Sequence, residues 1–493
     1  MKKYMIIGSL LFLFNSCTKN FDKINTNNYA PTNATGEAFL ASAEKGMTDI
    51  ITSANVNRNV YRQYAQYWTN TTYPQESRYD LITRAIPDNF WTSVYTGALK
   101  DCQLAKKAIA IDPLIIDENV RKAQTAIVDV WQCYAYHVLT STFGNVPYSQ
   151  AIDIENLQPK YDDGLTIHKD LINRLSNDIA VLDTCASSFG AGDIIYSGDN
   201  ASWSMFANTL KMKLGLMLAD VPAEVTFGKN AYEETVGHTF TSNADNAIFH
   251  YLGVTPNNNP VSDDLYGSGL TNRKDFVAAN TIVNSMLVRI DTTISGTDTT
   301  ITKIYDPRMG AYFTKNNAGI YKGGIYGTSN GWSSNSKPSY DLVQLDAPAL
   351  IMDYAEVEFM LAEGAERGWT VTGTAESHYN AGVTASCDYW GVDATSYLAE
   401  PTIAYNTAAG TWKQKIGTQQ WLAYYNRGFE GWTSWRRLDY PILNVPQNLT
   451  YADIPVRWTY PVKEQTLNGS SYSSASSAIG GDLRATKLYW DKQ

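Results

Sequence analysis

The sequence predicts a mainly α-helical protein, built as a single domain of stacked helical hairpins with a large irregular loop region. Two observations carry this prediction. Apolar and aromatic residues recur at spacings of three and four over much of both halves of the chain, the periodicity of amphipathic helices. Between about residues 221 and 348 that periodicity gives way to Gly, Asn, Ser and Thr with scattered aromatic residues.

The first sixteen residues predict a signal peptide for export. Lys2 and Lys3 precede an apolar run from Met5 to Phe14, which is shorter than the about 20 apolar residues that a transmembrane helix needs. The run ends at Ser16-Cys17, a pattern typical of bacterial lipoprotein signals, in which the cysteine is acylated. We therefore expect a lipid on Cys17; the alternative is an ordinary cleavage site with a cysteine nearby by chance.

Residues 17–36 predict a flexible tether. This stretch is polar, contains five asparagines and Pro31, and lacks the apolar content needed to form a core. Its length would let the globular part, residues 37–493, stand off a membrane and still reach a partner embedded there. Acyl chains each contribute about 0.8 kcal/mol per buried methylene, so stable anchoring requires more than one chain.

Helical periodicity and capping signals place the expected helices. Trp131, Tyr134 and Ala135 suit a tetratricopeptide-like helix, although no strict repeat is found. Asp353 is positioned to cap a helix after Ile351, with Glu356 as its capping-box partner. The expected segments are two helices within Glu37–Asn70, one from Pro87 to Leu99, and others at Asp117–Thr140, Leu165–Leu182, Ala201–Ala219, Ile351–Gly368 and Ala375–Asp388.

The irregular middle has two elements of its own. A helical pattern runs from Asp275 to Arg289, and threonine-rich residues 291–303 predict a hairpin that turns at Ser295-Gly296. Long loops inside a compact protein are usually functional or disordered. The many aromatic residues here indicate an ordered, functional surface.

Composition excludes several functions. The net charge is −10, and removal of Lys2 and Lys3 with the signal would leave −12, which argues against nucleic-acid binding. Besides Cys17 the chain has Cys102, Cys133, Cys185 and Cys387, with no C-x-x-C pair, so neither a zinc nor a redox site is indicated. They could pair in any of three connectivities or stay buried as thiols, which is the commoner case in a chain this long, and we assign no disulfide. The five histidines show no ligand spacing, and we expect no metal or other cofactor, although a structural calcium site built from loop oxygens would leave no sequence pattern.

One motif matches the consensus sequence of a catalytic site. Gly327–Gly331 satisfies G-x-S-x-G around Ser329, and Asp353 and His378 follow in the order of a hydrolase triad. A nucleophile elbow needs a buried strand before the serine and a helix after it, whereas glycine and serine surround Ser329. An esterase or glycoside hydrolase therefore stands only as the alternative function, since 49 acidic residues leave room for an unrecognised carboxylate pair.

Aromatic and amide side chains are the strongest candidates for a binding site. The chain has 33 tyrosines and 13 tryptophans, and sugar rings stack on such side chains while amides bind hydroxyl groups. Trp332 stands out because only Gly331, Ser333 and other small polar residues flank it. Each ring could instead pack internally. The candidate ligand contacts are Trp332, Tyr326, Tyr321, Tyr312, Trp68, Asn70 and Tyr73.

Six segments, in order, resemble the signatures of the SusD/RagB family of nutrient-binding lipoproteins. The match runs over nearly the whole mature chain and is nearest to the SusD-like branch. The segments are Phe143–Ala151, Tyr354–Glu363, Tyr379–Val383, Gln419–Ala423, Glu430–Arg437 and Ile454–Pro461, with Glu464 and Asn468 also in place.

The resemblance implies a fold, a location and a partner. It implies one domain of tetratricopeptide-like helix pairs with a loop-built binding surface, lipid-anchored in the outer membrane and facing the exterior. It also implies a SusC-like TonB-dependent transporter that receives oligosaccharide or peptide from the lipoprotein. Arg436 and Arg437, with Glu430 and Asp439 near them, would fix C-terminal loops; a scaffold that binds only protein is a further alternative.

Overall fold

The computed structural model describes residues 34–295 and 298–492. Residues from Gly36 onward form one compact unit. The predicted signal peptide, most of the tether and Cys17 lie outside the described residues, so these remain predictions. No helix of the described part combines the length and apolar character required to cross a bilayer.

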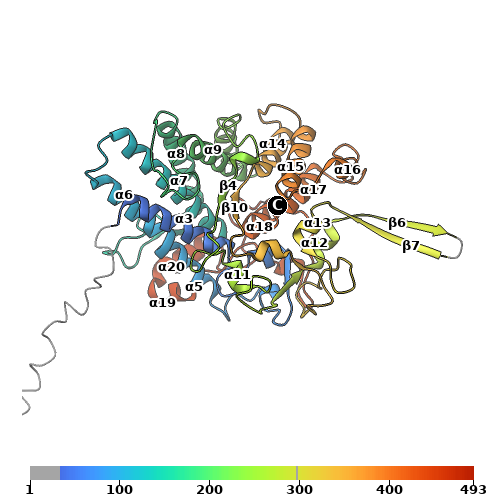
Figure 1. Cartoon of the computed structure of the whole chain (residues 1–493). Coiled ribbons are helices and arrows are strands. Elements are labelled where there is room, and N and C mark those ends of the chain that lie inside the picture. The colour runs from blue at the N-terminus through green and yellow to red at the C-terminus, as the bar shows by residue number, and fades with distance from the viewer. Residues whose placement is uncertain (1–33, 296–297, 493) are drawn as a thin grey trace, which may run out of the picture. The chain divides into compact units, whose positions relative to one another are not determined.

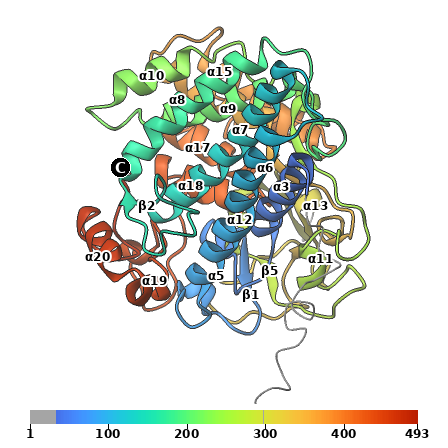
Figure 2. The same ribbon diagram turned by 90° about the vertical axis from the view of Figure 1, so that its left-hand side faces the viewer.

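Antiparallel helices stacked side by side make up the first part of the fold (Figures 1 and 2). Helices α5 and α6 continue into each other through η2, a π-helical segment. The elements are α3 (Gly36–Thr52), α5 (Ile86–Ser93), η2 (Val94–Leu99), α6 (Lys100–Ile111), α7 (Glu118–Phe143), α8 (Gly164–Leu182), α9 (Asn200–Met217) and α10 (Val225–Glu233). Successive pairs from α6 to α10 contact each other, which confirms the tetratricopeptide-like arrangement.

A second stack is formed from the last third of the chain. Its helices are α14 (Tyr354–Glu366), α15 (Ala375–Tyr389), α16 (Thr395–Leu398), α17 (Trp412–Ala423) and α18 (Gly428–Leu438). Helix α14 packs on α15, α17 and α9, so it joins the two stacks. Helices α19 (Val462–Leu467) and α20 (Gly469–Ala478) form a small hairpin near α5.

Aspartate side chains cap the N-termini of four of the long helices. Each accepts a hydrogen bond from a backbone N–H of the first turn, which satisfies a donor that has no partner within the helix. These caps are Asp117 for α7, Asp163 for α8, Asp199 for α9 and Asp353 for α14. The predicted cap at Asp353 is confirmed, with its carboxylate 3.0 Å from the Glu356 nitrogen.

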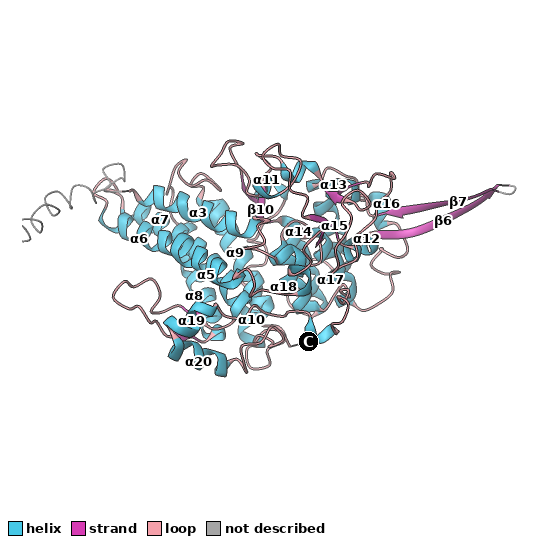
Figure 3. Ribbon diagram, turned by 90° about the horizontal axis from the view of Figure 1, so that it is seen from below, coloured by secondary structure: helices cyan, strands magenta, loops and turns pink. Residues whose placement is uncertain are grey.

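Strands are short and occur as antiparallel pairs (Figure 3). The longest pair, β6 and β7, confirms the predicted hairpin and extends from the body as an arm (Figure 1); Gly296 of its expected turn lies outside the described residues. The strands are β1 (Trp68–Asn70), β2 (Val146–Pro147), β3 (Tyr161–Asp162), β4 (Ala247–Phe249), β5 (Phe276–Ala278), β6 (Leu287–Ser295), β7 (Asp298–Tyr305), β8 (Phe313–Thr314), β9 (Lys337–Pro338) and β10 (Ala349–Met352).

Short helical segments lie in the loops that connect these elements. They are α4 (Tyr61–Tyr64), η1 (Glu76–Arg78), η3 (Asn243–Asp245), α11 (Val261–Asp264), α12 (Asn280–Ser285), α13 (Met309–Tyr312), η4 (Tyr340–Val343) and η5 (Tyr451–Asp453).

Two helix predictions were wrong in part. Only α4 forms in the second half of Glu37–Asn70, because Gln66 adopts a left-handed conformation with φ of 57° and the chain then enters β1. The segment from Asp275 to Arg289 divides into β5, α12 and the start of β6. Strand β1 pairs with β5, so a contact between distant segments overrides the local helical pattern in both places.

Buried acidic residues of α14 pair with cations both within the second stack and across to the first. Glu363 is fully buried and binds Arg437 of α18 and Arg367 at the end of its own helix, so it joins helices of the second stack. Glu356 does not complete a capping box; its carboxylate instead binds Lys213 of α9 and, at 3.0 Å, Arg427. Pairing of this kind offsets the cost of removing each charge from water.

Candidate functional site

Three aromatic rings from different loops gather around Tyr266, which follows α11 in the chain. The centroid of Tyr266 lies 6.0 Å from that of Trp332 and 6.4 Å from that of Tyr340, both in edge-to-face geometry. Tyr266 is 37% exposed, Tyr340 is 43% exposed and Trp332 is half-buried. We call these three residues the aromatic platform.

Gly267 leaves the space that lets two of the platform rings, Tyr266 and Tyr340, lie close together. Gly267 has a φ of 123°, and a Cβ atom there would lie 2.7 Å from Cδ1 of Tyr340. Only glycine fits both the backbone conformation and this space. The loop therefore fixes where Tyr266 and Tyr340 face each other.

Two lysines stand over platform rings. The Nζ atom of Lys274 is 4.9 Å from the centroid of Tyr266, and that of Lys337 is 5.8 Å from the centroid of Trp332. Burial, together with repulsion from Lys274, lowers the pKa of Lys337. Such cations steady an aromatic ring and offer donors to a hydroxyl-rich ligand.

A groove with a volume of about 250 Å³ opens beside the platform, between the loop after β1 and the segment before β5. Tyr73, Thr72 and Arg273 are among the residues that line it. Thr71 joins the two segments, since its hydroxyl donates to the Lys274 carbonyl and its N–H to that of Asp275. The 325–331 loop is held to the same strand end, because the Asn330 N–H donates to the Thr71 carbonyl at 2.8 Å.

The groove contains polar groups fixed by ion pairs. Arg273 binds Asp264 at 3.0 Å and Asp275 at 2.5 Å. Burial raises the pKa of Asp264 to about 6, although Arg273 is beside it. Groove and platform together offer flat apolar faces next to fixed hydrogen-bonding groups, an arrangement that suits a sugar.

Four of the seven candidate ligand residues are buried. The hydroxyl of Tyr312 donates to the Leu422 carbonyl, and that of Tyr326 to the Gln63 carbonyl. The indole N–H of Trp68 donates to Tyr425, and Asn70 bonds with Glu76 and Ser77. These side chains support the loops from inside, and Asn70, although only 3% exposed, is also among the residues that line the groove.

The other three candidates reach the surface. Tyr73 is 63% exposed in the groove, and Trp332 belongs to the platform. Tyr321 is half-buried at the base of the β6–β7 arm, where its ring contacts Tyr305 at 5.5 Å. The structure thus brings Tyr73 and Trp332 onto neighbouring loops and leaves Tyr321 next to the arm.

The sequence matches, over residues 27–461, the model of a SusD-like family described as starch-binding and associating with the outer membrane. The chain belongs to the SusD-like family. This membership confirms the resemblance found in the sequence and supports a nutrient-binding role at the outer membrane. A comparison with curated protein sequences gave no match.

Solved structures of SusD homologues share the fold of this SusD-like chain. A SusD homologue from Parabacteroides distasonis is 23% identical with a TM-score of 0.77, over 93% of this chain and 98% of that one. A chitin-binding SusD homologue from Flavobacterium johnsoniae is 22% identical with a TM-score of 0.73, over 92% and 98%. A SusD-like protein from Bacteroides thetaiotaomicron is 22% identical with a TM-score of 0.73, over 93% and 99%.

The three residues of the motif-derived triad have separate partners in the SusD-like fold. The Ser329 hydroxyl donates to the Thr72 carbonyl at 2.9 Å. Asp353 caps α14 and binds Arg427. His378 bonds with Glu358 through Nδ1 and with the Thr372 carbonyl through Nε2. This arrangement does not assemble a nucleophile, a base and its orienting acid.

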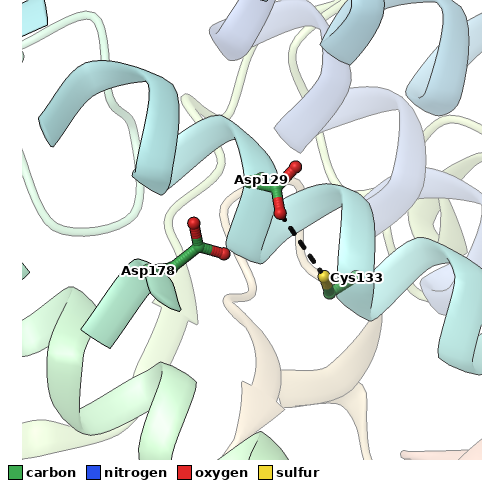
Figure 4. A group of neighbouring side chains, drawn as sticks. All are labelled: Asp129, Cys133 and Asp178. Atoms are coloured by element: carbon green, nitrogen blue, oxygen red, sulfur yellow. Dashed lines mark hydrogen bonds between the residues drawn. The ribbon is translucent and has the colours of Figure 1, made fainter. Parts of the chain in front are cut away.

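Asp129, Cys133 and Asp178 form the one group of potential metal ligands found among the described residues (Figure 4). Asp129 already binds two cations, Arg174 at 2.6 Å and Lys106. Despite burial, they hold the pKa of Asp129 below its usual range, while burial and the Asp129 charge raise the pKa of Asp178 well above it. This balance indicates a carboxyl group held beside a carboxylate, and we propose no metal there.

Sequence reasoning missed Tyr266 and Tyr340. Tyr266 shares only half of the setting that selected Trp332, because Gly267-Ser268-Gly269 follow it but the apolar Leu265 precedes it. Tyr340 has no comparable signal, because its place on the platform depends on Gly267, which is distant in the sequence.

Proposed function

We propose that the chain binds an oligosaccharide on the aromatic platform and adjoining groove, without cleaving it. The exposed edge-to-face cluster of Tyr266, Trp332 and Tyr340 carries the proposal. Sugar rings present C–H faces that stack on such rings, and the ion-paired groups of the groove can bind hydroxyls. A family described as starch-binding and a chitin-binding homologue support a glycan over a peptide.

We further propose that the chain delivers this ligand to a TonB-dependent transporter of the SusC type in the outer membrane. A lipid on Cys17 would hold it there, with the binding surface facing the exterior. The family description, which associates these proteins with the outer membrane, supports this location. Labelling of Cys17 by a fatty-acid analogue, and copurification of an outer-membrane barrel, would test the anchor and the partner separately.

Replacement of Trp332 by Ala tests the binding function. Loss of a stacking ring should weaken oligosaccharide binding by about 1 to 3 kcal/mol. Isothermal titration calorimetry with malto- and chito-oligosaccharides and with peptide pools would measure this change. Trp412→Ala is a matched control, because Trp412 is also half-buried under cations, Arg367 and Lys413, but lies on α17. Unchanged affinity in Trp332→Ala would contradict the proposed site.

Catalysis is tested with the same samples. Chromatography of the oligosaccharides after incubation should return them intact. Turnover that disappears in Ser329→Ala would favour an esterase. Cleavage of glycosidic bonds by the unmodified chain would favour a glycoside hydrolase instead.

A further inference from the structure

A second cavity lies on the other side of the η4 turn from the aromatic platform. Its volume is about 180 Å³, below the about 300 to 1,000 Å³ of pockets that enclose a drug-sized ligand, so it has room for one ring of a longer chain. Its lining comes from distant parts of the sequence, including Leu342, Ala347, Tyr389, Trp390 and Asn426. We call it the η4 pocket.

The η4 turn connects this pocket to the platform. In a 3-10 helix, residues three apart lie on the same side. Tyr340 and Val343 both face Gly267, next to the platform, since a Cβ atom at Gly267 would lie 2.7 Å and 2.9 Å from their side chains. Asp341 and Leu342, between them, line the pocket. A chain bound on the platform thus has a pocket one turn away.

The pocket has an apolar floor and polar groups that the protein does not use. Leu342, Ala347 and Ala349 are nearly buried and supply the floor. Within the described residues, the Trp390 indole N–H, the Tyr389 hydroxyl and the Asp341 carboxylate form no hydrogen bond. Polar groups that line a cavity and have no hydrogen-bond partner in the protein can bind a ligand or water.

Asn426 adds a directed donor. Its Oδ1 atom accepts a hydrogen bond from Arg62 Nε at 2.9 Å, which fixes the orientation of the amide. Its backbone is left-handed, with φ of 70°, in the turn before α18. The Nδ2 group forms no hydrogen bond within the described residues and remains available for an acceptor on a ligand.

We propose that the η4 pocket binds the acetamido group of a terminal N-acetylated sugar, a specificity that rests on the oligosaccharide binding proposed above. The acetamido methyl packs on the apolar floor. Its carbonyl accepts from Asn426 or Trp390, and its N–H donates to Asp341. A plain hexose lacks the methyl and the amide, so it gains little from this pocket.

Two substitutions test the pocket apart from the platform. Ala347→Phe fills the cavity, and Asp341→Asn removes a charged acceptor at an exposed position without changing its size. Both should lower the affinity for chitotetraose by about tenfold, equal to about 1.4 kcal/mol, and leave that for cellotetraose unchanged. Asp346→Asn, an exposed aspartate nearby that does not line the pocket, is the matched control.

Saturation-transfer NMR with N-acetylglucosamine alone separates this proposal from the general one. We expect the strongest transfer at the acetamido methyl, its loss in Ala347→Phe and its retention in Trp332→Ala. Absence of transfer to the monosaccharide, or equal loss of both tetrasaccharides in the pocket variants, would overturn the η4 pocket. Binding of cellotetraose that depends on Trp332 would still support the proposed function.

Discussion

Charged residues have different roles in the helical stacks and on the loop surface. Within the second stack, Glu363 of α14 is fully buried and its carboxylate binds two arginines. On the loop surface, Arg273 is 43% exposed in its side chain and bridges Asp264 and Asp275 at the edge of a groove. The first set holds helices together, and the second orders groups that a ligand can reach.

This difference indicates which substitutions should change stability and which should change ligand binding. A buried charge that loses its partner keeps its desolvation cost, whereas an exposed one is solvated by water. Changes to the buried ion pairs of the helices should therefore reduce the free energy of unfolding. Changes on the platform should reduce ligand affinity and leave stability nearly unaltered.

Glu363→Gln should have the largest effect on stability. Arg437 would then be buried without a carboxylate, and the expected loss is about 3 to 5 kcal/mol in the free energy of unfolding, measured by urea denaturation. Glu366→Gln is the control, because Glu366 is exposed on the same helix and glutamine keeps an acceptor for the Tyr405 hydroxyl. Equal midpoints for the two variants would show that the buried pair does not hold α14 against α18.

The same comparison explains what could be predicted from the sequence. Helices α7, α8, α9 and α14 were predicted nearly to their ends, because their apolar periodicity and aspartate caps are local signals. The β6–β7 hairpin was also predicted from its own residues. These elements form where neighbouring residues determine the backbone.

Burial in the loops could not be predicted in the same way. Tyr326 and Trp332 both lie among glycines and small polar residues, yet Tyr326 is 2% exposed because its hydroxyl reaches Gln63, 263 positions away. Trp68 is buried because β1 pairs with β5. Only contacts between distant segments separate a supporting ring from one that reaches the surface.

Tyr266→Ala should have the next largest effect, and on affinity rather than stability. Tyr266 contacts both other platform rings, so its loss should weaken oligosaccharide binding by about 1 to 3 kcal/mol. Combined with Trp332→Ala, the loss should fall short of the sum of the two by about 0.5 to 1.5 kcal/mol, because the rings support each other. Calorimetric titration of both single variants and the double variant would measure this coupling.

Tyr451→Ala is the matched control for the platform. Tyr451 has the same 43% exposure as Tyr340 and also contacts a tryptophan edge-to-face, Trp435, at 6.4 Å. Its replacement should leave affinity unchanged. Additive losses at Tyr266 and Trp332, or an equal loss at Tyr451, would mean that the three rings do not act as one platform.

His378 between α14 and α15 should give the smallest effect, visible as a dependence of stability on pH. Burial lowers its pKa, but the hydrogen bond and charge of Glu358 and the Thr372 carbonyl outweigh this and raise the pKa above the ordinary 6.5. A raised pKa in the folded state stabilises the fold fully below 6.5, and this stabilisation is lost as pH rises through the folded-state value. For a partly exposed pair we expect about 0.2 to 1 kcal/mol.

Urea denaturation of wild type and His378→Gln across pH would measure this effect. The wild type should exceed the variant most in mildly acidic solution, where His378 is charged, and the difference should close at alkaline pH. A gap that widens with pH would reverse the sign, and it would mean that neutral His378 is the form that joins the two helices. The oligosaccharide affinity of His378→Gln should equal that of wild type, since His378 bonds with Glu358 and Thr372 rather than with the loops of the platform.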